Sequence, residues 1–219
     1  TTDGFAQKIV NRLNAIKGCS VLITRDLKDD SFFKNVLEGN GYKVEGISFI
    51  ETKKVNLLSV PQADWVFFAS SNAVDYFFNQ NPELKSKTKF GVIGKSTEQE
   101  LKKHNRNAAF VGSVPDTKVV GKKFAKTVGD ETVLFPQAKG GLRTIQQQFE
   151  DSSKLTDLVV YETVKKENAK LPDAEILVFT SPSNVESFFE KGKIKSTQQV
   201  IAIGKSTEKK LTEHGVENC

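Results

Sequence analysis

The chain contains one unit of sequence twice. The segment FGVIGKSTEQELKKH at 90–104 recurs as VIAIGKSTEKKLTEH at 200–214, and SSNAVDYFF at 70–78 recurs as SPSNVESFF at 181–189. Two shorter pairs precede these in the same order: VLITR at 21–25 with VLFPQ at 133–137, and IET at 50–52 with YET at 161–163. Because the blocks recur about 110 residues apart, the chain is expected to fold as two similar lobes.

Each block begins with a short apolar segment that predicts a strand. Residues 64–69 are rich in aromatic and aliphatic side chains, which is typical of a buried strand. Ser70, Ser71 and Asn72 follow directly, and their side chains are of the kind that cap the first turn of a helix. Apolar residues then recur at intervals of three and four, the spacing of one helical face.

The pattern of a strand followed by a helix continues. Residues 90–93 predict the next strand, and Ser96 or Thr97 is expected to cap a helix that ends near His104. Strands that alternate with helices indicate a parallel sheet with helices on both faces. The predicted fold class is therefore α/β, with two similar lobes whose parallel sheets are flanked by helices.

Two predicted strands, 42–50 and 156–164, lead into charged segments instead of helices, and they occupy equivalent places in the repeats. We interpret them as crossings between the lobes, paired as a two-stranded β connector. The expected limits are a discontinuous first lobe of 1–45 plus 165–219, a second lobe of 52–157, and connector strands at 46–51 and 158–164. A helix-like segment at 3–17 precedes the repeat.

The repeated GKSTE, at 94–98 and 204–208, resembles a phosphate-binding loop but lacks the spacing of one. The Walker pattern requires a glycine five residues before the glycine of Gly-Lys, and the chain has Lys89 and Gln199 there. The glycines also fail the spacing of a dinucleotide fingerprint. The repeats therefore do not predict a nucleotide site.

The same loops are suited to bind carboxylates. Each lies where the carboxyl end of a strand opens a helix, and backbone N–H groups and the helix dipole favour an anion there. Two lobes with two such helix starts each predict a site for a ligand that carries many carboxylates. The alternative is that the serines and threonines cap helices and have no other role.

Six short motifs follow one another in a characteristic order: VLITR (21–25), FASSNAV (68–74), VIGKST (92–97), VVYET (159–163), FTSPSNV (179–185) and AIGKST (202–207). This ordered set resembles the uroporphyrinogen-III synthase family, from residue 19 to the end of the chain. The resemblance implies two α/β lobes joined by a two-stranded ladder. It also implies that hydroxymethylbilane is closed to uroporphyrinogen III, with inversion of the last pyrrole ring and loss of water, and with neither cofactor nor metal.

The resemblance further implies a catalytic role for Tyr161, as the residue that helps the substrate hydroxyl to leave. A structural role is the alternative, in which the ring packs on its strand and the hydroxyl bonds neighbouring backbone. The other repeat has Ile50 at this position, which favours the catalytic role. The expected substrate-binding residues are Arg25, Ser70, Ser71, Thr97, Ser181, Ser183, Ser206 and Thr207.

Four positions depart from the family pattern, one of which is Ser48, where a proline is frequent. Gln137 stands where the second repeat often has arginine, so Lys139 or Arg143 is expected to supply the positive charge instead. Glu98 and Glu208 add negative charge beside the proposed anion sites.

The composition of the chain limits which classes of partner and which compartment are expected. The net charge of +5 suits a linear tetrapyrrole with eight carboxylates, and the scattered lysines do not predict nucleic-acid binding. The apolar runs are too short to span a membrane. The two cysteines, Cys19 and Cys219, lack C-x-x-C spacing, which argues against a zinc site or a disulfide framework and fits the cytoplasm. The chain is expected to act as a monomer.

The two histidines, His104 and His214, end their predicted helices. We interpret them as C-terminal caps rather than as an acid–base pair. The alternative function is a non-enzymatic two-lobed binding protein for a polycarboxylate or a tetrapyrrole. It would share the anion sites but would not need Tyr161.

Overall fold

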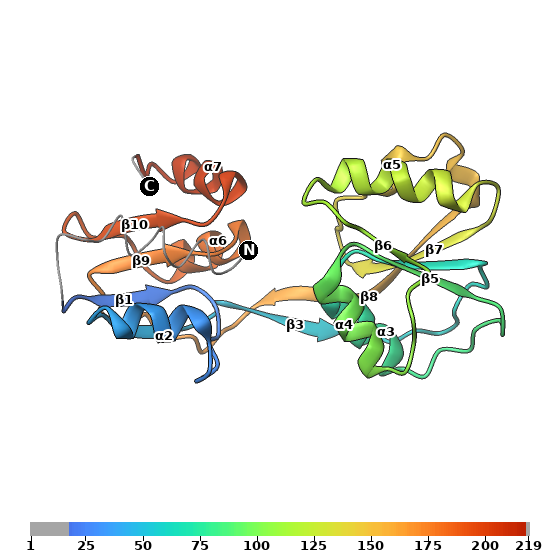
Figure 1. The fold of residues 1–219 in the computed structure, drawn as a ribbon. Helices are drawn as coiled ribbons and strands as arrows, with labels where there is room; N and C mark the ends of the chain where they lie inside the picture. Colours follow the sequence, from blue (N-terminus) through green and yellow to red (C-terminus); the bar gives the residue numbers. More distant parts are fainter. Residues whose placement is uncertain (1–17, 218–219) are drawn as a thin grey trace. The chain divides into compact units, whose positions relative to one another are not determined.

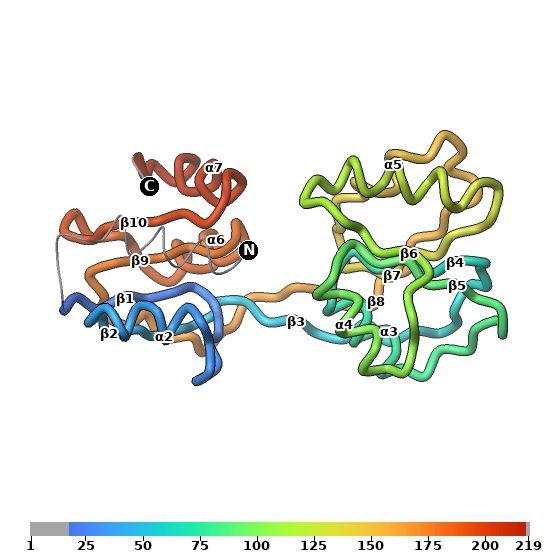
Figure 2. Tube along the Cα trace, in the orientation of Figure 1, coloured from blue at the N-terminus to red at the C-terminus, as the bar shows by residue number. Residues whose placement is uncertain are grey.

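The computed structural model describes residues 18–217, which divide into two compact units (Figure 1). Unit 1 contains the described residues up to Glu51 and those from Val164 onward, and unit 2 contains Thr52–Thr163. The chain crosses between the units within β3 (Ile50–Lys54) and β8 (Leu155–Lys165), which are neighbours in one sheet and run side by side in Figure 2. The predicted α/β fold with parallel sheets and a two-stranded connector is confirmed.

Unit 1 is built on a four-stranded parallel sheet in the order β10-β9-β1-β2. On β1, Val21 and Ile23 face the core that is covered by α2, whereas Leu22 faces the core that is covered by α6 and α7. This alternation follows from the two-residue period of a strand. The elements are β1 (Ser20–Ile23), α2 (Phe32–Gly39), β2 (Lys43–Gly46), β9 (Ile176–Phe179), α6 (Pro182–Lys191), β10 (Gln199–Ala202) and α7 (Lys205–Glu213).

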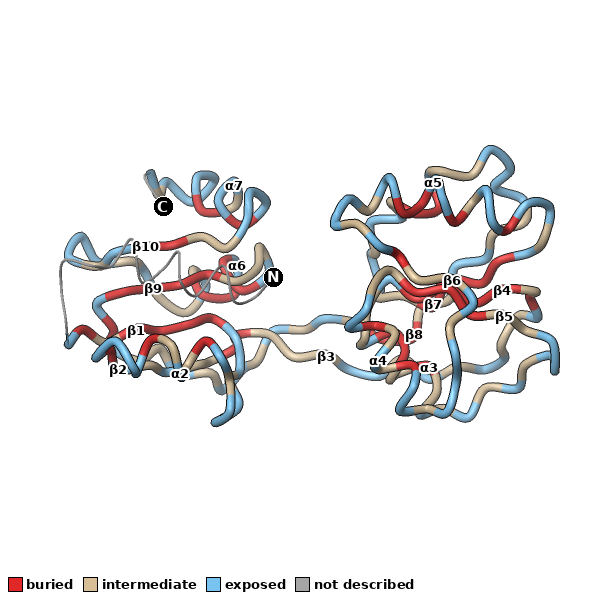
Figure 3. The backbone as a smooth tube through the Cα atoms, in the orientation of Figure 1, coloured by how far each residue is buried: buried red, intermediate tan, exposed pale blue. Residues whose placement is uncertain are grey.

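Unit 2 repeats the design on a six-stranded sheet in the order β3-β8-β7-β4-β5-β6. Helix α5 covers one face and α3 and α4 cover the other (Figure 1). Figure 3 shows the central strands as the buried layer, and all four residues of β4 are buried. The remaining elements are β4 (Trp65–Phe68), α3 (Ser71–Phe78), β5 (Lys89–Val92), α4 (Lys95–Lys103), β6 (Phe110–Val111), α5 (Thr117–Val128), β7 (Val133–Ala138), η1 (Gln146–Gln148) and η2 (Ser152–Lys154).

The prediction of one strand over 42–50 is wrong, because the segment forms two strands, β2 and β3, separated by a turn. Side chains from distant parts of unit 1 bind the backbone of this turn. The carboxylate of Asp26 accepts a hydrogen bond from the N–H of Ser48 (3.0 Å), and the amide oxygen of Asn184 accepts one from the N–H of Phe49 (2.8 Å). These N–H groups are thus satisfied without a strand partner, and the chain can leave the sheet after Gly46.

Gly46 and Asp26 are both adapted to this turn. A Cβ on Gly46 would lie 2.5 Å from Cγ of Leu27, so no other residue fits without a shift. Partial burial raises the pKa of Asp26, but hydrogen bonds from Lys166 and from the N–H of Ser48 outweigh that effect and hold the pKa below its usual value. The carboxylate that supports the turn therefore stays ionised.

The helices of the described chain are short, and the longest, α5, has 12 residues. Within residues 18–217, no helix combines the length and the apolar character that a membrane crossing requires. The helical pattern expected at 3–17 lies outside the described residues.

Candidate active site

The first candidate site in unit 2 lies at the carboxyl ends of β4 and β5. The two strands are parallel, with Phe68 opposite Val92, so the loops that follow them emerge at the same edge of the sheet. Ser70 is the N-cap of α3, and its Oγ accepts a hydrogen bond from the N–H of Ala73 (3.1 Å). The predicted capping role of Ser70 is confirmed, and Ser71 is the first residue of the helix.

The prediction that Ser96 or Thr97 caps the next helix is wrong. Helix α4 starts directly after Gly94, which offers no side chain, so both residues lie inside the first turn. The side chain of Thr97 is buried, whereas Ser96 is exposed. Because no side chain caps this helix, its first N–H groups are left for solvent or for a ligand.

Tyr161 approaches the start of α3. Its hydroxyl lies 3.4 Å from Oγ of Ser70, and its ring stacks on Tyr76 with 5.2 Å between the ring centroids. The hydroxyl of Tyr76 donates instead to the carbonyl of Thr52 (2.8 Å). Two tyrosine rings are thus packed together, and the hydroxyl of Tyr161 alone of the two points to the cap of α3.

An irregularity in the sheet sets the direction of Tyr161. The pairing of β7 with β8 shifts register between Gln137 and Ala138, so that Gln137 lies opposite Val159 but Ala138 lies opposite Tyr161. Val160 and Tyr161 are adjacent, yet both are buried in the core under α3 and α4. A β-bulge has this effect, because the extra residue breaks the alternation of faces.

Basic residues beside this edge of unit 2 are already paired. Nε of Arg143 lies 2.7 Å from the carboxylate of Asp157, and Nζ of Lys139 lies 3.3 Å from that of Glu162. The amide oxygen of Gln137 accepts a hydrogen bond from Gln146 (3.1 Å). Lys139 and Arg143 are therefore not free charges in this state, although both are exposed enough to exchange partners.

Unit 1 carries the equivalent helix start after β9. Ser181 is the N-cap of α6, and its Oγ accepts hydrogen bonds from the backbone N–H (3.3 Å) and the side-chain amide (3.1 Å) of Asn184. Asn184 is buried and also holds the N–H of Phe49, so it joins the helix start to the connector. Ser183 is exposed on the first turn.

The second helix start of unit 1 follows β10. Helix α7 begins after Gly204, whose φ of 93° is in the left-handed region that favours glycine. Ser206 is exposed, but Thr207 is buried and its hydroxyl donates to the carbonyl of Ile203 (3.1 Å). As in α4, the expected side-chain cap is absent from this helix, and the first backbone N–H groups are the polar groups at its start.

Two threonines outside the set of predicted site residues, Thr24 and Thr180, join the ends of β1 and β9. Thr24 is fully buried, and its Oγ1 accepts a hydrogen bond from the N–H of Thr180 (3.0 Å). The hydroxyl of Thr180 donates to the carbonyl of Thr24 (2.7 Å). They fix the backbone that precedes Arg25 and Ser181. Both threonines directly follow an apolar run in the sequence, and this position could have marked them as residues near the site.

Arg25 itself is exposed, and among residues 18–217 no carboxylate pairs with it. Its guanidinium therefore remains available to an anionic ligand. The structure thus divides the predicted residues between the units. Unit 2 brings together Tyr161 and Ser70 and holds Ser71 and Thr97 on adjacent helices; the others lie in unit 1 (Arg25, Ser181, Ser183, Ser206 and Thr207).

Both histidines end their helices as predicted, because His104 is the C-cap of α4 and His214 is the C-cap of α7. Each ring also stacks on a phenylalanine, His104 on Phe78 and His214 on Phe189. They lie at the opposite ends of these helices from Gly94 and Gly204, so they take no part in the candidate sites at the helix starts.

Comparisons with known proteins agree on one family. The family model described as "Uroporphyrinogen-III synthase HemD" matches residues 6–219. The fold resembles the crystal structure of uroporphyrinogen-III synthetase from Helicobacter pylori, with 18% identity, a TM-score of 0.68 and 91% of each chain covered. It also resembles a mutant uroporphyrinogen III synthase from Thermus thermophilus, with 16% identity, a TM-score of 0.51, and 91% of this chain and 90% of that chain covered. No curated protein matches the chain. Since the family model spans nearly the whole sequence, the chain belongs to the uroporphyrinogen-III synthase family.

Proposed function

We propose that this chain closes hydroxymethylbilane to uroporphyrinogen III through groups at the four helix starts and on β8. The observation that carries the proposal is the approach of the Tyr161 hydroxyl to the N-cap of α3, in a chain of this family. In the reaction the substrate loses its hydroxyl as water, and the last pyrrole ring is inverted before the ring closes. Closure without inversion would give the symmetric isomer, so the protein must both assist departure and fix a conformation.

Tyr161 is proposed to donate its proton to the departing hydroxyl. The electron pair of the pyrrole nitrogen expels this hydroxyl, which leaves as water once it has taken the proton. Ser70 supports this direction of donation, because its Oγ already accepts the N–H of Ala73 and its own proton can go to the oxygen of Tyr161. The positive end of α3 also favours the phenolate that remains.

The substrate carboxylates are proposed to bind at the helix starts. Helices α4 and α7 begin without a side-chain cap, so their first N–H groups can donate to an anion. The first residues of these two helices, Lys95 and Lys205, are not buried and add positive charge. Arg25 adds a third cation, in the loop after β1. A non-enzymatic binding protein would use the same groups, but membership of an enzyme family favours catalysis.

The test supplies hydroxymethylbilane, made enzymatically, to the purified protein and separates the oxidised products by isomer. We expect uroporphyrinogen III to be the main product, formed faster than the symmetric isomer forms spontaneously. Production of the symmetric isomer alone, at the rate of the protein-free control, would contradict the proposed reaction.

Thr97→Val and Thr207→Val are expected to raise KM by no more than about tenfold and to leave kcat nearly unchanged. Each substitution removes one hydroxyl while the backbone N–H groups stay in place, and one neutral hydrogen bond contributes about 0.5–1.5 kcal/mol. Thr97→Ser and Thr207→Ser keep the hydroxyl and are the matched controls. Steady-state kinetics separates the two constants, and a loss of kcat without a change in KM would contradict a binding role.

We also propose that the protein acts as a monomer in the cytoplasm and does not bind nucleic acid. Its lysines are scattered, and Cys19 is a buried free thiol, which suits a reducing compartment. Sedimentation at micromolar concentration tests the oligomeric state, and a stable dimer would refute this part of the proposal.

A further inference from the structure

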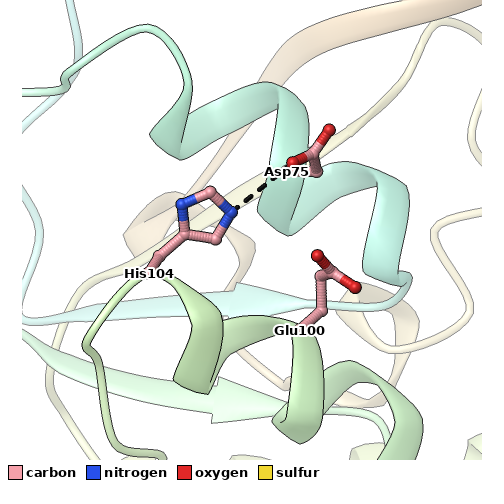
Figure 4. A group of neighbouring side chains, drawn as sticks. All are labelled: Asp75, Glu100 and His104. Carbon is pink, nitrogen blue, oxygen red and sulfur yellow. Dashed lines mark ion pairs between the residues drawn. The ribbon is translucent and has the colours of Figure 1, made fainter.

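Three side chains of metal-binding type meet on the α3–α4 side of unit 2. Asp75 lies on α3, Glu100 lies on α4, and His104 ends α4. One ligand atom from each lies within 4.8 Å of the others, and Figure 4 shows the imidazole and the two carboxylates directed toward one another. Imidazole and carboxylate groups together are a donor set of first-row divalent metals such as Zn²⁺.

The spacing of the imidazole and Asp75 matches the coordination of one ion. Nε2 of His104 lies 3.5 Å from Oδ1 of Asp75. Two ligand atoms that each lie about 2.0–2.1 Å from a tetrahedral Zn²⁺ are about 3.3 Å apart. The imidazole is held in place by its stacking on Phe78, with 5.3 Å between the ring centroids. Two of the ligands are therefore already at nearly the required separation.

The internal repeat offers a direct comparison. The positions of Asp75, Glu100 and His104 correspond in unit 1 to Glu186, Lys210 and His214. There, Nζ of Lys210 lies 2.9 Å from the carboxylate of Glu186 and 2.8 Å from that of Glu213. These two carboxylates raise the pKa of Lys210 to about 12. Unit 1 thus supplies its own cation at the point where the two helices meet.

In unit 2 the residue that corresponds to Lys210 is Glu100, a third potential metal ligand instead of a cation. Among the described residues, Glu100 pairs only with Lys103 on the next turn of its own helix (2.8 Å), and that lysine is 68% exposed. Asp75 accepts a hydrogen bond from the side-chain amide of Asn79 (2.9 Å), and among the described residues no lysine or arginine pairs with it. Two carboxylates therefore face a histidine without a fixed positive charge between them.

We propose that Asp75, Glu100 and His104 bind one divalent transition-metal ion, best Zn²⁺, which takes the place that the ammonium group of Lys210 has in unit 1. A rotation of the Glu100 side chain away from Lys103 completes a three-ligand set, and water supplies the fourth position. The ion would tie α3 to α4 at the end of α4 that lies opposite Gly94. The site is thus distinct from the reaction centre, for which the family resemblance implies no metal, and its role is to stabilise unit 2.

The test titrates ZnCl2 into the full chain by isothermal calorimetry. We expect one Zn²⁺ per chain and a rise in Tm with Zn²⁺ concentration. Glu100→Lys copies the residue of unit 1 and should weaken binding by more than about 100-fold, because loss of a ligand exceeds the 10–100-fold effect of outer contacts. Its circular dichroism spectrum without metal should match that of the unsubstituted protein, which separates loss of the site from loss of the fold.

Lys210→Glu is the reciprocal variant. It gives unit 1 the same types of side chain at the three positions, so the stoichiometry should rise from one to two Zn²⁺ per chain. Absence of Zn²⁺ binding by the unsubstituted protein, or equal affinity in Glu100→Lys, would overturn the proposal. If Lys210→Glu still binds a single ion, the metal in unit 2 does not take the place of the Lys210 ammonium group in unit 1, and the proposal is overturned.

Discussion

Tyr161→Phe is expected to slow the turnover of hydroxymethylbilane about 10²–10⁴-fold, the usual contribution of a general acid. The substitution removes one hydroxyl and leaves the stacking on Tyr76 intact, so the fold and the affinity for product should change little. Single-turnover kinetics of substrate loss, together with product titration, separates the chemical step from binding.

Tyr76→Phe is the matched control for this experiment. It also removes one tyrosine hydroxyl. This hydroxyl donates to the carbonyl of Thr52, whereas the hydroxyl of Tyr161 lies near Ser70. We expect its turnover to stay within about tenfold of the unsubstituted protein, since one neutral hydrogen bond contributes about 1 kcal/mol. Undiminished turnover in Tyr161→Phe would return Tyr161 to a packing role, and conformational steering would then have to carry the reaction.

Phe124→Ala is expected to destabilise unit 2 by about 3–5 kcal/mol, the usual cost of removing a buried phenylalanine side chain. Phe124 on α5 is fully buried and lies at the centre of a group of rings. Its ring centroid is 4.4 Å from that of Phe67, 5.0 Å from that of Phe110 and 5.4 Å from that of Trp65. Because the core is closely packed, its neighbours would relax only partly into the cavity left behind.

The position of the single tryptophan makes this measurement specific. Trp65 is buried in the same core as Phe124, so its fluorescence during urea unfolding follows unit 2. Val119→Ala, on the same helix but 39% exposed, is the control and should change the free energy of unfolding by no more than about 0.5 kcal/mol. Equal urea midpoints for the two variants would show that the ring cluster does not determine the stability of unit 2.

The strands and helices of the repeated blocks were predictable because each is a continuous local pattern. The fully buried β4 is apolar at every position, and α3 follows it with its apolar residues at helical spacing. Because the same motifs recur at 181–189 and 200–214, the same strands and helices could be predicted in unit 1. Such local patterns depend only on neighbours in sequence, which is why the strands predicted at 64–69, 90–93 and 156–164 agree with β4, β5 and β8 to within a residue.

The errors arose where residues distant in sequence decide the structure. The turn between β2 and β3 depends on Asp26 and Asn184, and the second of these lies 135 residues from the N–H that it binds. The start of α4 is an error of a different, local kind, because Gly94 begins the helix before the more typical capping residues Ser96 and Thr97. Tyr161 and Ser70 are 91 positions apart in the sequence, and their contact depends on a β-bulge that no local sequence pattern predicts.

The discontinuity of unit 1 also has a consequence for biosynthesis. In its sheet, β1 lies between β2 and β9, and Val21 pairs with Ile176. The first described strand and helix therefore leave the ribosome early, but one face of β1 has no core to pack against until β9, α6 and α7 have been made. Unit 2 is an uninterrupted stretch, Thr52–Thr163, and can form in the meantime. Within residues 18–217, β1 and α2 thus emerge before unit 2 but complete their packing only after it.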